Sequence, residues 1–133
     1  MKPPYRPAAL RREVADVVAA AHTADLDGNR PLARGSYERA IRMLTRDEGE
    51  FAPALIRQIA RSYIDDGIFD AALDCLAAAQ HLSRARGDTA GVADAYHQMA
   101  EANRKRGDLE SAEALDTKAQ AVAKAATAAT PVI

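Results

Sequence analysis

The sequence predicts an all-α protein of six helices, on three observations. Alanine supplies 32 of the 133 residues, while Tyr and Phe number only 4 and 2 and Trp is absent. Close packing must therefore come from helices that approach each other over small side chains. Apolar residues recur at helical spacing, as at Ile56, Ile59 and Tyr63. A fixed pattern of alanines and glycines also occurs three times along the chain.

The repeated pattern is an alanine, a glycine seven residues later, an alanine five further on and an alanine after another seven. It occupies Ala21, Gly28, Ala33 and Ala40, then Ala60, Gly67, Ala72 and Ala79, and finally Ala100, Gly107, Ala112 and Ala119. We interpret each glycine as the turn of a helical hairpin, because a left-handed backbone conformation commonly ends a helix and suits glycine best. The alanines are expected where the helices cross.

The helices are expected at about 7–26, 31–46, 51–66, 69–86, 89–106 and 109–128. Pro7, Pro31 and Pro53 stand near three of these starts, where the N–H that proline lacks has no helical partner. The chain is then a single domain, 1–133, with repeats at about 14–52, 53–92 and 93–128 and a short frayed tail at 129–133.

Charge and cysteine content restrict the function. The 18 basic and 19 acidic residues nearly cancel, which argues against a general binder of nucleic acid or of anionic membranes. The longest apolar run, 17–21, is too short to span a bilayer, and the N-terminus has no apolar stretch typical of a secretory signal. A single cysteine, Cys75, forms no intrachain disulfide and is expected to be a small packed side chain. We expect a cytoplasmic protein, and the excess of arginine over lysine suggests a bacterial source.

The spacing resembles that of the tetratricopeptide repeat (TPR) family over about 14–120. The family's order of small, aromatic, glycine, small, apolar and small positions is matched in the middle copy by Ala60, Tyr63, Gly67, Ala72, Leu76 and Ala79. The period of 39 to 40 residues exceeds the usual 34, so the resemblance is to the longer-repeat type. Ala24 replaces the tyrosine in the first copy, and Asn103 and Asp116 are polar where the family prefers apolar residues. We interpret these two as the outer side of a terminal cap.

The resemblance implies a right-handed α-solenoid of three hairpins whose first helices line a concave groove. It assigns to that groove His22, Asp25, Arg57, Arg61, Asp65, His97, Glu101, Arg104 and Lys105, together with Ala15, Val18, Ala54, Ile64 and Asp94. Some family members clamp a chaperone's terminal carboxylates with lysine, asparagine and arginine at five positions. The matching residues here are Val18, His22, Gln58, Asp94 and Gln98, so that clamp is absent.

Two pairs in the groove could carry specific chemistry. Arg57 and Arg61, one helical turn apart, suit a carboxylate or phosphate, although they could equally be a solvated pair with Asp65 as ion partner. His97 and Glu101 have the spacing of metal ligands but lack a third ligand, so no metal site is predicted. A basic stretch formed by Arg34, Arg39, Arg42 and Arg46 is expected on a solvated outer face.

No motif for catalysis or for a cofactor is present, so we expect no catalytic residue, no cofactor and no enzyme activity. The leading hypothesis is a scaffold or adaptor that binds a protein or peptide segment in the groove. One alternative is a regulatory or sensory module that binds a signalling peptide or small ligand and controls an effector, and another is a TPR-type secretion chaperone. Neither nucleic acid nor membrane is expected as a partner, and the chain should be a monomer or a weak homodimer.

Overall fold

The computed structural model describes residues 9–129, and these residues form six α-helices, one 3₁₀ helix and no strand. The fold is therefore all-α, as predicted. The elements are α1 (Arg12–Leu26), α2 (Arg30–Met43), the 3₁₀ helix η1 (Arg46–Phe51), α3 (Ala52–Asp65), α4 (Phe69–Ala85), α5 (Thr89–Lys105) and α6 (Leu109–Ala129). Four of the six predicted helices agree with the structure within one residue at each end.

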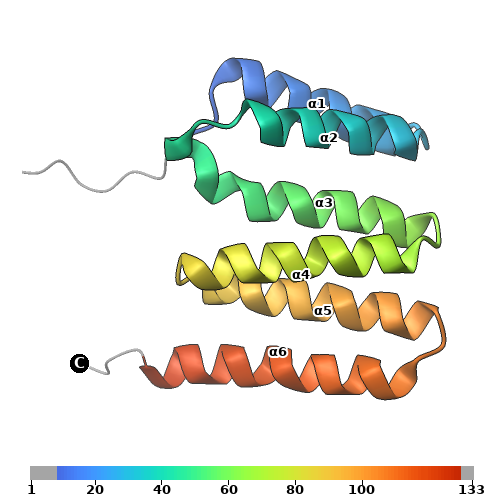
Figure 1. Cartoon of the computed structure of the whole chain (residues 1–133), viewed down its shortest axis with the longest axis vertical. Coiled ribbons are helices and arrows are strands. Elements are labelled where there is room, and N and C mark those ends of the chain that lie inside the picture. Colours follow the sequence, from blue (N-terminus) through green and yellow to red (C-terminus); the bar gives the residue numbers. More distant parts are fainter. Residues whose placement is uncertain (1–8, 130–133) are drawn as a thin grey trace, which may run out of the picture.

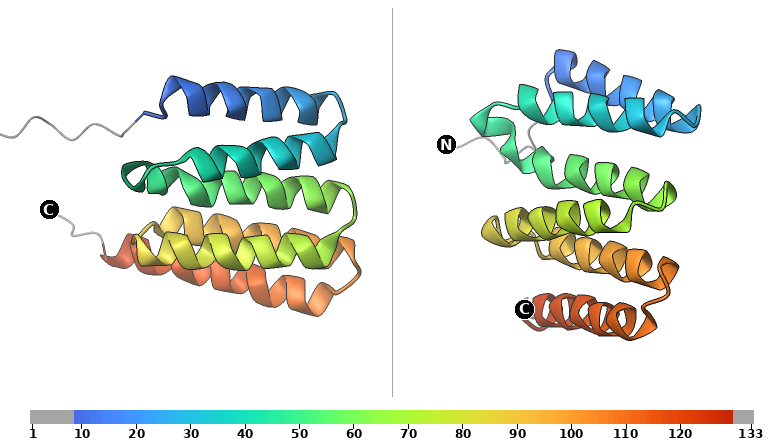
Figure 2. Two further views of the ribbon diagram at one scale, coloured as in Figure 1. Left: turned by 45° about the horizontal axis from the view of Figure 1, so that its top comes forward. Right: turned by 45° about the vertical axis from the view of Figure 1, so that its right-hand side comes forward.

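Each helix packs mainly against the helices before and after it in the chain. Figures 1 and 2 show the helices stacked along the long axis, with successive helices running in opposite directions. Beyond these neighbours, α3 also contacts α5. The first helices of the second and third hairpins thus contact each other, and the surface formed by α1, α3 and α5 is called the odd-helix face below.

The three predicted hairpin turns are confirmed. Gly28, Gly67 and Gly107 have φ values of +80°, +73° and +89°, in the region that side chains disfavour. Each glycine N–H bonds to a carbonyl three residues earlier and so helps to end the preceding helix. A fourth glycine with positive φ, Gly87, joins α4 to α5 and lies outside the predicted pattern.

All nine patterned alanines are buried, with at most 1% of their surface exposed. They lie among larger core residues such as Tyr37 and Leu76, which are themselves buried. Cys75 is partly buried and packs against both core clusters, as predicted. Burial, and then the charges of Asp74 and Glu38, raise the pKa of its thiol.

The helix ends around the first hairpin differ from the prediction. Helix α1 begins at Arg12 rather than at residue 7, and residues 7 and 8 lie outside the described residues. Helix α2 ends at Met43 because Leu44 is extended, with φ −63° and ψ 132°, and η1 then fills the connection to α3. The predicted frayed tail also begins too early, since residue 129 closes α6, while 130–133 lie outside the described residues.

A buried carboxylate fixes this connection. Glu48 of η1 is only 6% exposed. Its Oε1 accepts hydrogen bonds from the Thr45 N–H at 3.0 Å and from Arg11 Nε at 2.9 Å, and its Oε2 accepts one from the Arg11 N–H at 3.3 Å. Arg11 Nη2 also donates to the Met43 carbonyl at 2.6 Å. The segment that enters α1 is thereby held against the connection between α2 and α3.

Because of these contacts, the stability of the fold is expected to depend on pH in the acidic range. The Thr45 N–H is the main cause that lowers the pKa of Glu48 to about 2; Arg11 adds to it and burial opposes it. The carboxyl's ordinary value is 4.5, so its contribution to stability is complete above that pH and is lost as pH falls toward 2. Unfolding temperatures measured over this range should fall more steeply for the wild type than for Glu48→Gln, with the exposed Asp47→Asn variant behaving like the wild type. Equal slopes for wild type and Glu48→Gln would show that Glu48 has no such role.

Two polar residues lie where the sequence did not place them. Arg34, expected on a solvated outer face, instead bonds to Asp66 Oδ2 at 2.7 Å and to Ser62 Oγ at 3.0 Å, with its guanidinium 4.5 Å from the centre of the Tyr63 ring. Asn103, expected on the outer side of a cap, is 3% exposed. Its amide donates to the Met99 carbonyl at 3.0 Å and accepts from Arg106 Nε at 3.0 Å, and this pairing allows its burial.

Candidate functional site

The odd-helix face carries two adjoining pockets. The first is a cavity of about 410 Å³ between α1 and α3, called the apolar pocket here. Its lining is mostly aliphatic and consists of Leu10, Ala15, Val18, Ala19, His22, Tyr37, Ala54, Leu55 and Gln58. Pockets of this volume with few polar groups are typical of ligand sites.

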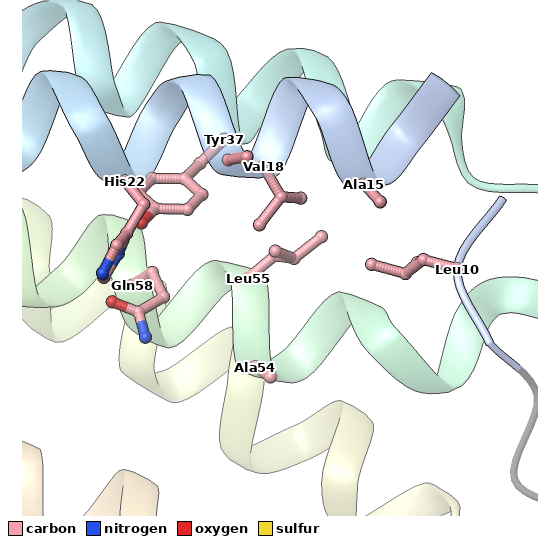
Figure 3. Close-up of a pocket in the computed structure, with 9 residues that line it drawn as sticks. Leu10, Ala15, Val18, His22, Tyr37, Ala54, Leu55 and Gln58 are labelled. Carbon is pink, nitrogen blue, oxygen red and sulfur yellow. The ribbon is translucent and has the colours of Figure 1, made fainter. Parts of the chain in front are cut away.

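The two ends of the apolar pocket differ in chemistry, as Figure 3 shows. Val18 of α1 and Leu55 of α3 lie across from each other in its middle, and Leu10 lies at one end. His22 and Gln58 lie at the other end, near the ring of Tyr37, which reaches the pocket from α2. Burial, and then the negative charge of Asp25, raise the pKa of Tyr37, so its phenol keeps its proton at neutral pH. A bound group would therefore contact aliphatic side chains along most of the pocket and polar side chains at one end only.

The second pocket, of about 230 Å³, lies between α3 and α5 and is called the polar pocket here. Its lining consists of Ala54, Arg57, Gln58, Arg61 and Gln98. Ala54 and Gln58 also line the apolar pocket, so the two pockets adjoin on α3. Gln98 Nε2 donates to the Arg57 carbonyl at 3.3 Å and ties α5 to α3 at this point.

The two arginines of the polar pocket differ in whether they form a salt bridge. Arg61 Nη1 donates to Glu101 Oε2 at 2.6 Å. Burial alone would raise the pKa of Glu101, but hydrogen bonds and charges from Arg61 and Lys105 outweigh it and hold the pKa below its ordinary value. Glu101 is therefore ionised at neutral pH and neutralises Arg61.

Arg57 has no such partner. Its Nη1 atom is buried, and no acceptor among the described residues bonds to it. Arg57 also takes part in none of the salt bridges among the described residues. A guanidinium without a counter-charge, beside a polar cavity, is suited to bind an anionic oxygen.

The structure brings together part of the predicted groove. Four of its residues line the apolar pocket (Ala15, Val18, His22 and Ala54), and three line the polar pocket (Ala54 again, Arg57 and Arg61). Asp65 is exposed, and Arg61 pairs with Glu101, so the alternative in which Asp65 pairs with the arginines is wrong. Ile64 is 2% exposed and packs in the core, so its assignment to the groove is also wrong.

The predicted groove residues of α5 form ion pairs with residues of α5 and α6. His97 Nδ1 and Arg104 Nη2 lie 3.3 Å and 2.6 Å from the carboxylate oxygens of Asp116 in α6, and Lys105 Nζ lies 3.5 Å from Glu101 Oε1. These side chains line neither pocket. His97 and Glu101, considered above as metal ligands, thus bond to different partners. In residues 9–129 no group of three or more His, Cys, Asp or Glu side chains could hold a metal ion.

Four residues of the apolar pocket were not predicted to lie there: Leu10, Ala19, Tyr37 and Leu55. Tyr37 and Leu55 follow the apolar periodicity, which predicts burial but not a position beside a cavity. Leu10 precedes α1, and its position depends on the contacts of Glu48 and Arg11 that join segments 37 residues apart. No local sequence signal predicts such a contact.

Comparisons with known proteins support the fold. The structure of the globular C-terminal domain of P. aeruginosa LpoP is similar, with a TM-score of 0.73 and 22% sequence identity over 84% of this chain and 99% of that one. No protein-family model matches the sequence, and no curated protein matches it either. At this level of identity the likeness concerns the fold alone. None of the helices in residues 9–129 is both long and apolar enough to cross a bilayer.

Proposed function

We propose that the chain is a TPR-like scaffold that binds a peptide segment of a protein partner along the odd-helix face. The observation that carries this proposal is the pair of adjoining pockets, one aliphatic and one polar, with the unpartnered Arg57 beside the second. Binding sites for side chains commonly combine an apolar cavity with a few fixed polar groups.

Contacts within the chain hold the helices of this face together. Arg61 with Glu101, and Gln98 with the Arg57 carbonyl, join α3 to α5, and α2 packs against both α1 and α3. A preformed surface loses little conformational freedom when a partner binds, which favours affinity. A role in binding rather than in catalysis also agrees with the lack of a catalytic motif in the sequence.

The size of the apolar pocket favours one second candidate. A volume of about 410 Å³ falls within the range of roughly 300–1,000 Å³ usual for small-molecule sites. A sensory module that binds a small ligand here and controls an effector is therefore the second candidate. A secretion chaperone would use the same face for a longer segment, and no feature of the pockets favours it.

The test uses a matched pair of charge reversals. Immobilised wild type should retain partner proteins from a lysate of the source organism, and Arg57→Glu/Arg61→Glu should lose them, because the reversal turns the polar pocket acidic. Arg39→Glu/Arg42→Glu, on the exposed surface of α2, should retain them. Circular dichroism should show equal helix content in all three.

Calorimetry with the identified partner then gives the magnitude. We expect the pocket variant to lose affinity at least about tenfold, or roughly 1.4 kcal/mol. Loss of binding in the α2 variant, with the pocket variant unaffected, would place the interaction on another face and contradict the proposal.

A further inference from the structure

The polar pocket has an excess of positive charge in its lining. Two guanidinium groups line it and no carboxylate does. Arg61 is neutralised by Glu101, whose side chain is 32% exposed and also lies near Lys105. The uncompensated positive charge of the pocket is therefore that of Arg57.

The buried Nη1 of Arg57 also requires an acceptor. A buried donor without a partner lowers stability, and more so when the group is charged. Nη1 itself is closed to solvent, so water or a ligand in the pocket meets the rest of the guanidinium, which lines the pocket and takes part in no salt bridge among the described residues. A carboxylate suits the accessible part of this guanidinium better than water, because it brings the opposite charge and can accept hydrogen bonds from it.

The adjoining apolar pocket sets a second requirement for the ligand, namely an apolar group. Because Ala54 and Gln58 line both pockets, a ligand that reaches Arg57 has the apolar pocket directly beside it. Resting on the proposed function, we propose that the partner segment places an apolar side chain between Val18 and Leu55 and a nearby aspartate or glutamate against Arg57. In an extended segment two side chains on the same side are two residues apart, about 6–7 Å, so the two groups belong within about two residues of each other.

The proposal is tested first by selection from a library. Random peptides displayed on phage, fused through their C-termini so that only side-chain carboxylates are free, are selected on wild type, Arg57→Met and Arg39→Met. Wild type and Arg39→Met should enrich peptides with an aromatic or aliphatic residue within two positions of Asp or Glu. Arg57→Met should enrich the apolar residue without the acidic one.

The outcomes separate this inference from the proposed function. If no peptide is enriched on any of the three proteins, peptide binding itself fails. If wild type selects apolar peptides without an acidic preference, or if Arg57→Met keeps that preference, the scaffold stands and the carboxylate site at Arg57 is wrong.

A selected peptide then allows a double-mutant cycle in which one change is made in the peptide and the other is Arg57→Met. Replacing its acidic residue by the neutral amide should weaken binding to wild type about tenfold or more in fluorescence polarisation. The same replacement should have little effect on binding to Arg57→Met, because the interaction that it removes is already lost. An equal loss on both proteins would overturn the assignment of the carboxylate to Arg57.

Discussion

Ala72→Leu and Ala79→Leu are each expected to lower the free energy of unfolding by on the order of 1–3 kcal/mol. Both side chains are fully buried in α4, which packs between α3 and α5. The added methylene and methyl groups have no space there, so either the helices separate or neighbouring side chains leave their preferred rotamers. Chemical denaturation monitored by circular dichroism measures the loss.

Ala125→Leu is the matched control, since Ala125 is exposed on α6. The same substitution should change the stability there by no more than about 0.5 kcal/mol. Small and equal effects at all three alanines would contradict the view that the repeated alanines mark tight helix crossings.

Gly91→Ala should be destabilising by a similar amount, about 1–3 kcal/mol, although glycine is usually a poor helix former. Gly91 lies in the first turn of α5, and a Cβ there would come within 2.6 Å of the Ser83 hydroxyl of α4 and would also press on the Asp88 carboxylate. Asp88 caps α5 by accepting the Gly91 N–H at 3.0 Å, so the methyl group disturbs the cap as well.

The same substitution at Gly35 should have the opposite sign. Gly35 is an exposed residue of α2, and a Cβ there would meet no atom within 4 Å. Gly35→Ala should therefore stabilise the protein by about 0.5–1 kcal/mol through helix propensity alone. Adding Ser83→Ala to Gly91→Ala should recover part of the loss, because Ser83 is buried and its hydroxyl has no partner among the described residues. If the two glycine substitutions shift the unfolding temperature in the same direction, the close approach of α4 and α5 at Gly91 is wrong.

The sequence predicts the helices and turns well because they depend on local requirements. Gly28, Gly67 and Gly107 have a backbone conformation that few other residues tolerate, and their fixed distance from buried alanines reveals the hairpins. Pro31 similarly marks the start of α2, and the structure adds that the Asn29 side chain caps this helix by accepting the Leu32 N–H. Such signals need only a few consecutive residues.

The candidate site is less predictable, because its charges are set by contacts between distant segments. Arg61 and Glu101 are 40 residues apart, and Arg34 and Asp66 are 32 apart. Helical spacing gives several possible partners for each arginine, and only the packing angle of the helices selects one. The packing thus pairs Arg61 with Glu101 and leaves Arg57 without a salt bridge among the described residues. Asn103 is a similar case, because its burial depends on the position of Arg106.

Amide chemical-shift mapping with a library-selected peptide would show whether partners bind along the odd-helix face. With ¹⁵N-labelled protein, we expect the shifts to concentrate at Val18, His22, Leu55, Arg57 and Gln98, on the odd helices α1, α3 and α5. The exposed residues Arg39 and Ala125 of the even helices α2 and α6 should remain unshifted. Shifts concentrated on α2, α4 and α6, with the residues of both pockets unchanged, would contradict binding along this face.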